Sequence, residues 1–331
     1  MALGVPPDQV ASLEVVNLVQ LLQGSHDAAQ RLVRAARRDG MFYLEIPEGN
    51  EPGSMGRLVQ GIYAACEELF RLPLDDKMKL DVDQLSEYKT NGYKPIGRNI
   101  GGLPGHRDGF ESYAVSCGSR ELGLLCWPGP LETYQEYLLD FSSRCYDILR
   151  VICQVLSAEL NLPPGVSFEA LHGGPDASFD IIRLLHYETG RQDSLFSVPQ
   201  VAHTDLGSLT VLFSETPGLQ VSDRAGSGQD KWLYVMPRRN CAVINLGDAM
   251  SLWSHGQFRS SVHRVASMPE NVMPERYSFA FLGRPVSSAP MCPLTGGPVE
   301  EENILLCEDW VKEKFRGLRG QKKMDLCCDH T

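Results

Sequence analysis

Residues 201–210 read Val201-Ala202-His203-Thr204-Asp205-Leu206-Gly207-Ser208-Leu209-Thr210 and lie in a part of the chain where apolar residues follow a period of two. This period begins near residue 180 and predicts short strands separated by turns. The expected strands are Ile181–Tyr187, Ser208–Ser214, Leu219–Ser222, Trp232–Met236, Cys241–Asn245, Ser260–Val265 and Tyr277–Leu282. Strands of this length and spacing indicate an antiparallel sandwich or barrel.

The N-terminal half has the pattern of helices. Ser25 can cap a helix that ends at Gly40. A short strand over residues 41–46, a helix over 54–71 and a long helix from Leu131 to Leu160 are expected to follow. The glycine-rich residues 90–116 are expected to form a loop near a pocket, and Cys307–Leu318 a final helix.

We expect one domain over residues 1–331, because 43% hydrophobic residues can bury a full-sized core. Its expected parts are a helix-rich region 1–125, a bracing helix 126–175, a β core 176–290, and a C-terminal helix and tail 291–331. The fold class expected is therefore mainly β with flanking helices.

Charge and cysteine usage exclude several partners. The formal charge is −11, from 31 basic and 42 acidic residues, which argues against nucleic-acid binding. The ten scattered cysteines indicate reduced thiols. The first residues lack a signal-peptide pattern, and no apolar stretch approaches the roughly 20 residues that span a bilayer. We expect a cytoplasmic protein without a membrane partner.

Three side chains within the β region have the types and spacing of a metal site. His203 and Asp205 would share one face of a strand, and His263 lies in a second apolar segment. A lone histidine there would more often be a hydrogen-bonded core residue. His255, in what reads as a turn, is the weaker candidate for a third ligand. Two imidazoles and one carboxylate form the set that holds ferrous iron for oxygen chemistry.

Arg276 and Ser278 follow on the next expected strand and share a face. A buried arginine without a protein acid is costly unless an anionic ligand completes it. Its planar guanidinium suits a carboxylate, and Ser278 can add a hydrogen bond. The alternative is an ion pair with a structural acid such as Asp248.

These segments resemble the 2-oxoglutarate and iron(II)-dependent dioxygenases of the isopenicillin N synthase-like superfamily. The matching residues are 201–210, Gly218-Leu219-Gln220-Val221, Asn245-Leu246-Gly247-Asp248, Ser254-His255-Gly256, His263-Arg264-Val265 and Arg276-Tyr277-Ser278. The likeness is densest over 180–285 and weaker over about 10–116.

The resemblance implies a double-stranded β-helix, or jelly roll, braced by helices, in a protein that is a monomer or a weak homodimer. It implies that His203, Asp205 and His263 bind Fe(II) and that 2-oxoglutarate and O2 react there. Arg276 and Ser278 would hold the distal carboxylate of 2-oxoglutarate. The activity implied is oxidation of a small organic, specialised-metabolite substrate by hydroxylation, desaturation or ring rearrangement.

One position departs from the family pattern. Many relatives carry Asn-Tyr-Tyr before the iron motif, where this chain has Leu185-His186-Tyr187. Tyr187 is expected to contact the cosubstrate, whereas Leu185 loses the asparagine contact. Leu185, Phe110, Tyr113 and Phe281 are candidates for lining the substrate pocket, although Phe281 has the opposite strand parity to Ser278.

Two other functions fit the same residues. An oxidase of the same superfamily could use the triad without 2-oxoglutarate, and succinate formation would separate the two. A jelly-roll binding protein could also keep the scaffold without turnover, but an intact triad argues against that alternative.

Overall fold

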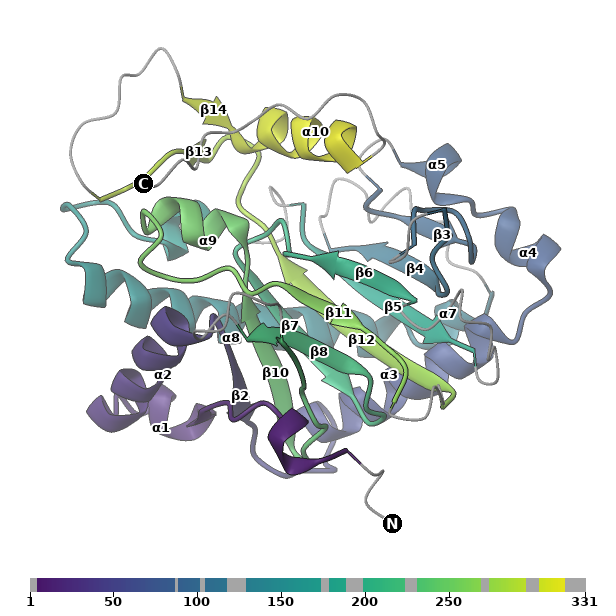
Figure 1. Cartoon of the computed structure of the whole chain (residues 1–331), viewed down its shortest axis with the longest axis horizontal. Coiled ribbons are helices and arrows are strands. Elements are labelled where there is room, and N and C mark those ends of the chain that lie inside the picture. The colour runs from purple at the N-terminus through teal and green to yellow at the C-terminus, as the bar shows by residue number, and fades with distance from the viewer. Residues whose placement is uncertain are drawn as a thin grey trace.

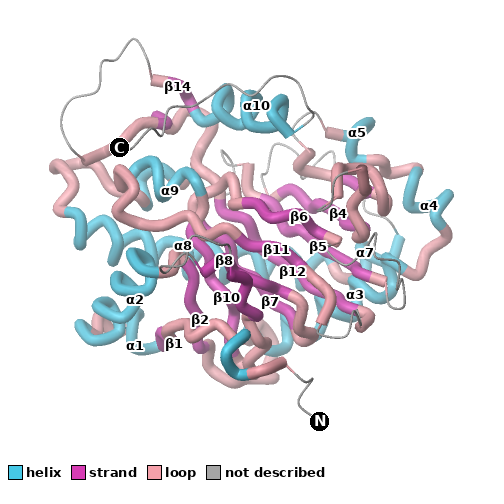
Figure 2. Tube along the Cα trace, viewed as in Figure 1, coloured by secondary structure: helices cyan, strands magenta, loops and turns pink. Residues whose placement is uncertain are grey.

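The computed structural model describes residues 5–86, 89–101, 105–117, 129–173, 179–188, 199–223, 231–268, 274–295 and 304–318. Two sheets form the centre of this part of the chain (Figures 1 and 2). The large sheet has the order β1 (Val15–Asn17), β2 (Met41–Glu45), β10 (Cys241–Leu246), β7 (Leu209–Ser214), β12 (Arg276–Gly283), β5 (Ile181–Tyr187), β4 (Glu111–Ser116) and β3 (Gly92–Lys94). The small sheet has the order β6 (Gln200–His203), β11 (His263–Val265), β8 (Leu219–Asp223) and β9 (Lys231–Tyr234).

The strands of both sheets pair antiparallel, except that β1 is parallel to β2. A separate antiparallel pair joins β13 (Pro290–Met291) and β14 (Leu305–Leu306). This arrangement agrees with the antiparallel β core that the sequence pattern predicts and with the jelly roll that the resemblance implies, so the expected fold class is confirmed.

Alternation along the central strand β12 separates two environments. Phe279 and Phe281 belong to the main hydrophobic cluster, which also contains the buried residues of the large helices. Arg276, Ser278 and Ala280 instead line a cavity on the other face. The sheet therefore has an apolar face under helices and a face that carries polar groups.

Three long helices cover the apolar face (Figure 1). They are α2 (His26–Arg38), α3 (Met55–Phe70) and α8 (Gln135–Leu160). The Ser25 hydroxyl accepts from Ala28 N and caps α2, and Ser54 caps α3 in the same way. The shorter helices are α1 (Leu18–Leu22), α4 (Leu74–Met78), α5 (Val82–Leu85), α7 (Gly129–Thr133), α9 (Asp248–Trp253), α10 (Cys307–Leu318) and the 3-10 turns Pro7–Gln9 and Glu169–Leu171. No described helix has the length and hydropathy that a bilayer crossing requires.

The structure corrects the sequence expectations at four places. Residues 90–116 contain β3 and β4, which extend the large sheet, so the loop expectation was wrong there. The long helix is interrupted at Tyr134, between α7 and α8. Strand β6 was not expected, and β11 begins only at His263. The expected C-terminal tail beyond residue 318 lies outside the described residues.

His172 predicts how the stability of the fold depends on pH. Its Nδ1 donates to Phe168 O at 2.7 Å, and its Nε2 shares a hydrogen bond with the Ser208 hydroxyl. Burial lowers the pKa of His172 to about 4, below the value of about 6.5 expected in the unfolded chain. The folded state therefore binds fewer protons than the unfolded chain. The contribution of His172 to the free energy of unfolding is fully present above pH 6.5 and is lost as the pH falls toward 4. We expect a loss of roughly 2 kcal/mol from this group between pH 7.5 and pH 5.

Urea unfolding at both pH values measures this effect. The pH dependence should be weaker in His172→Gln and unchanged in His26→Gln, because His26 is exposed. An equal pH dependence in wild type and His172→Gln would contradict the assignment.

Candidate active site

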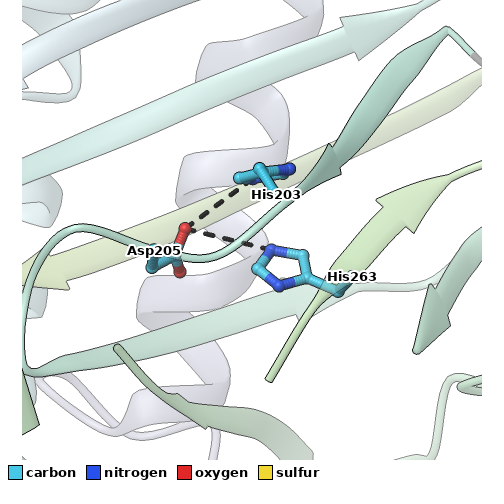
Figure 3. A group of neighbouring side chains, drawn as sticks. All are labelled: His203, Asp205 and His263. Carbon is cyan, nitrogen blue, oxygen red and sulfur yellow. Dashed lines mark ion pairs between the residues drawn. The ribbon is translucent and has the colours of Figure 1, made fainter. Parts of the chain in front are cut away.

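His203 and His263 face each other across two antiparallel strands of the small sheet. His203 is the last residue of β6, and His263 is the first residue of β11, in direct register. The centroids of their rings are 4.3 Å apart. Asp205 follows His203 by two residues, and its Oδ1 lies 3.8 Å from His203 Nε2 and 3.9 Å from His263 Nε2 (Figure 3). The three ligand atoms lie within 4.8 Å of one another, close enough for one ion to contact all three.

Hydrogen bonds of the two histidines determine which ring nitrogen of each remains available to bind a metal. Nδ1 of His203 donates to Val201 O at 2.8 Å, and Nδ1 of His263 donates to Ser261 O at 3.0 Å. Since the carbonyls accept the Nδ1 protons, each Nε2 keeps a lone pair that points toward Asp205.

Asp205 is held by donors from the large sheet. The Thr210 hydroxyl donates to Oδ2 at 2.5 Å and Asn245 Nδ2 donates to it at 2.8 Å, which leaves Oδ1 free. Burial raises the pKa of Asp205, but the two histidines and these donors outweigh it and hold the pKa below its usual value. Asp205 is therefore an anion in the folded protein.

Burial is the main reason that the pKa of His203 falls to about 4, and the neighbouring His263 lowers it further. His203 is therefore neutral near pH 7. The site combines neutral imidazole nitrogen with a carboxylate oxygen, the donor set that suits a divalent iron with open coordination positions. The residues present fit the ion that the sequence predicts.

The position of Asp205 is set by a close contact between two loops. Asp205 lies beyond the end of β6, so the expectation that one strand presents both it and His203 was wrong. Asp205 O instead accepts from Asp248 N at 2.8 Å, and Gly207 O accepts from Ala249 N at 3.1 Å, both at the start of α9. A Cβ on Gly247 would lie 2.2 Å from Gly207 O and 2.7 Å from Asp205 O.

Gly247→Ala should therefore displace the Asp205 loop and weaken iron binding. We expect iron affinity to fall by about 10 to 100-fold, the range observed when groups that orient a metal ligand are disturbed. Gly129→Ala is the matched control, because a Cβ at Gly129 meets no atom within 4 Å. Competition with a chelator measures the affinity, and equal affinities in both variants would contradict the prediction.

Arg276 and Ser278 lie together on β12. Arg276 is 1% exposed, and its Nη1 donates to Ser278 Oγ at 2.7 Å. Its Nε donates to Thr216 O at 3.3 Å, and its guanidinium carbon lies 4.9 Å from the centre of the Tyr187 ring. Burial lowers the pKa of Arg276, and no carboxylate of the described residues lies within ion-pair distance of it.

The alternative partner, Asp248, is engaged elsewhere. Its carboxylate accepts from Ser260 Oγ at 2.9 Å and pairs with Lys314 Nζ at 3.0 Å. Arg276 is thus a buried cation that can take up a carboxylate.

One cavity joins these two groups of residues. Its lining residues include His203, Asp205, His263, Arg276, Ser278, Tyr187 and Leu185, together with Arg183, Gln200, Thr210 and Asn245. The last four carry polar groups but are not among the residues that the sequence marks as candidates for the metal or the cosubstrate.

The four candidate substrate residues fall in different places. Leu185 lines the cavity, and Phe110 stacks on Tyr187 with ring centroids 5.4 Å apart. Tyr113 belongs to the main core cluster and does not line the cavity. Phe281 also belongs to that cluster and packs edge-on against Tyr146, as its parity indicates.

Comparisons with known proteins give a consistent result. Residues 178–285 match the model of the 2OG-Fe(II) oxygenase superfamily, and residues 13–121 match the N-terminal model of non-haem dioxygenases in morphine synthesis. The chain is 30% identical over 308 residues to the 2-oxoglutarate-dependent dioxygenase FG08081 of Gibberella zeae, covering 93% of this chain and 88% of the relative. It is also 30% identical to the 2-oxoglutarate-dependent dioxygenase frbH of Dothideomycetidae sp., covering 96% of this chain and 94% of the relative.

Solved structures share the fold. A full-length Neurospora crassa protein crystallised in complex with alpha-KG superposes with a TM-score of 0.74 at 22% identity, covering 94% of this chain and 97% of that chain. The rice dioxygenase for auxin oxidation gives a TM-score of 0.67 at 23% identity, covering 95% of this chain and 98% of that chain.

Proposed function

This chain belongs to the 2-oxoglutarate- and Fe(II)-dependent oxygenase superfamily, and we propose that it oxidises a small organic molecule of specialised metabolism in the cavity lined by its two sheets. The enzyme is a 2-oxoglutarate-dependent dioxygenase that uses Fe(II), 2-oxoglutarate and O2. The observation that supports this proposal best is the convergence of three metal-ligating atoms beside a buried arginine in one cavity.

We assign the iron to His203, Asp205 and His263. When bound, the iron supplies the oxygen chemistry, in which 2-oxoglutarate is decarboxylated to succinate and a C–H bond of the substrate is oxidised. The protein's contribution is orientation. The carbonyls of Val201 and Ser261 keep both imidazoles turned toward Asp205, so the metal does not have to reorganise its ligands.

We assign the distal carboxylate of 2-oxoglutarate to Arg276 and Ser278. The register of β12 against β5 supports a role for Tyr187 in the same site. Arg276 lies opposite Tyr187 in this register, and Ser278 lies opposite Leu185. Leu185 is apolar and packs with Phe110, Tyr187 and Val265. It cannot hydrogen-bond the cosubstrate, so the hold on 2-oxoglutarate depends on the Arg276 end of the cavity.

The same apolar cluster limits water in the cavity. Phe110, Leu185 and Val265 are each buried and lie beside the Tyr187 ring. A dry wall strengthens the electrostatic attraction between Arg276 and a carboxylate. It also protects the reaction from water.

An anaerobic spectrum tests the proposed function. Iron(II) is added to metal-free protein, followed by 2-oxoglutarate, and a new visible charge-transfer band is expected. Under air, succinate should form when a substrate is present. Iron binding without a band or succinate would instead support an oxidase that does not use 2-oxoglutarate.

We further propose that the enzyme acts in the cytoplasm as a monomer or weak homodimer, without nucleic-acid or membrane partners. The net charge of −11 supports the absence of nucleic-acid binding. Light scattering after size exclusion should give a mass near 36.7 kDa, and a stable larger assembly would contradict this part.

A further inference from the structure

Arg183 is a cation in the cavity that has no ion-pair partner among the described residues. It lies on β5 and, with Leu185 and Tyr187, lines the same cavity. Its Nε is buried and makes no hydrogen bond. No carboxylate of the described part of the chain lies within ion-pair distance of its guanidinium. The residue as a whole is only partly buried, so the rest of its guanidinium is accessible to a ligand in the cavity. A partly desolvated cation without a counter-charge is costly, which favours an anionic ligand beside it.

The neighbouring cations differ from Arg183 because each has an ion-pair or hydrogen-bond partner within the protein. Lys94 pairs with Asp108 at 2.5 Å and also donates to Phe110 O. Arg276 donates to Ser278 and Thr216. Asp205 attracts Arg183 electrostatically, but its Oδ2 is taken by Thr210 and Asn245 and its Oδ1 faces the two histidines.

Arg183 also lies apart from the residues assigned to 2-oxoglutarate. It is opposite Ala280 in the strand register, whereas Tyr187 is opposite Arg276. Four residues along a strand correspond to about 13 Å between Cα atoms. The Cα atoms are thus far enough apart for Arg183 to hold an anion other than the carboxylate on Arg276.

The net charge of the cavity with iron and 2-oxoglutarate bound also indicates that Arg183 needs a further anion. The divalent iron and Arg276 are balanced by Asp205 and the two carboxylates of 2-oxoglutarate. Arg183 then remains as an uncompensated cation beside the reaction site. An anionic substrate would compensate this excess charge, whereas a neutral one would leave it uncompensated.

We propose that Arg183 binds a carboxylate of the molecule that is oxidised, so that the enzyme's substrates are small organic acids. This inference rests on the proposed function, because it assumes that Fe(II) and 2-oxoglutarate occupy the assigned positions. Arg183 is then a residue that determines substrate specificity.

Binding of matched acids and amides tests the proposal. Wild type, Arg183→Gln and Arg183→Lys are loaded anaerobically with iron(II) and 2-oxoglutarate. Each protein is dialysed against aromatic, alicyclic and aliphatic carboxylic acids and the primary amide of each, and retained compounds are quantified by mass spectrometry. Arg150→Gln is the control, because this substitution also removes one positive charge but does so at an exposed position. The charge-transfer band is recorded for every protein.

We expect wild type and Arg150→Gln to retain at least one acid about 10 to 100-fold more strongly than its amide, the range for a charge-assisted hydrogen bond. Arg183→Gln should lose this preference and Arg183→Lys should keep part of it, with the band intact in both. A wild type that retains no acid more strongly than its amide would overturn the inference, and this comparison does not depend on how the variants fold.

Two other results are distinguishable. Loss of the band at modest 2-oxoglutarate in Arg183→Gln alone would place Arg183 in the cosubstrate site and also overturn the inference. Absence of the band in wild type would overturn the proposed function itself.

Discussion

Replacing Asp205 with alanine should eliminate iron retention and with it succinate formation. Asp205 supplies the anionic ligand, and its removal leaves two imidazoles with a buried divalent charge and no carboxylate to compensate it. Since disturbing groups that only orient a ligand costs about 10 to 100-fold in affinity, loss of the ligand itself should exceed about 100-fold. Iron content after desalting, measured by mass spectrometry, checks this result.

His255→Ala is the matched control for this experiment. His255 is exposed, has a left-handed backbone (φ 53°) after α9, and was the weaker candidate for the third ligand. It should leave iron content and succinate formation unchanged, whereas His263→Ala should behave like Asp205→Ala. Full iron retention in Asp205→Ala would disprove the assignment of the metal site.

Arg276→Gln should weaken 2-oxoglutarate binding by about 100-fold or more, because two charge-assisted hydrogen bonds to one carboxylate are lost in a buried site. The charge-transfer band should disappear at modest 2-oxoglutarate and return at high concentration. Iron content should stay the same, because Arg276 does not contact the three ligands.

Smaller changes at the same place separate charge from hydrogen bonding. Ser278→Ala removes one neutral donor and should cost about tenfold. Arg276→Lys keeps the charge but loses the planar geometry, so its affinity should fall between wild type and Arg276→Gln. If Arg276→Gln binds 2-oxoglutarate as tightly as wild type does, the cosubstrate lies elsewhere.

The sequence predicted β12 and most of the other core strands, but it missed β4 and β6. The alternation in Arg276–Gly283 gave β12, because its two faces differ. Strand β4 is buried along its whole length, so Glu111–Ser116 shows no alternation. Strand β6 has no consistently buried side, and its pairing with β11 is non-local. Both strands were therefore missed.

The same reasoning explains which site residues could be predicted. His203, Asp205 and Arg276 lie in short motifs that can be recognised without the fold. Thr210 and Asn245 support Asp205 from β7 and β10, and only the pairing of these strands brings them together.

The sequence could have predicted that Arg183 faces the cavity. It lies four residues before Tyr187 on the same expected strand, and residues an even number apart on a strand face the same side. The parity of β12 correctly indicated that Phe281 faces away from the cavity. Tyr113 is paired with Leu184 and follows the core-facing parity of β5.

Strand β2 has a consequence for biosynthesis. Met41–Glu45 pairs with Val15–Asn17 on one side and with Cys241–Asn245, nearly two hundred residues later, on the other. One edge of this apolar strand therefore stays unpaired until β10 has left the ribosome. Conversely, residues 178–285 made alone would leave the edge of β10 uncovered and the apolar face of the sheet without α2, α3 and α8. We therefore expect that fragment to aggregate when expressed, and the full chain to depend on chaperones during its synthesis.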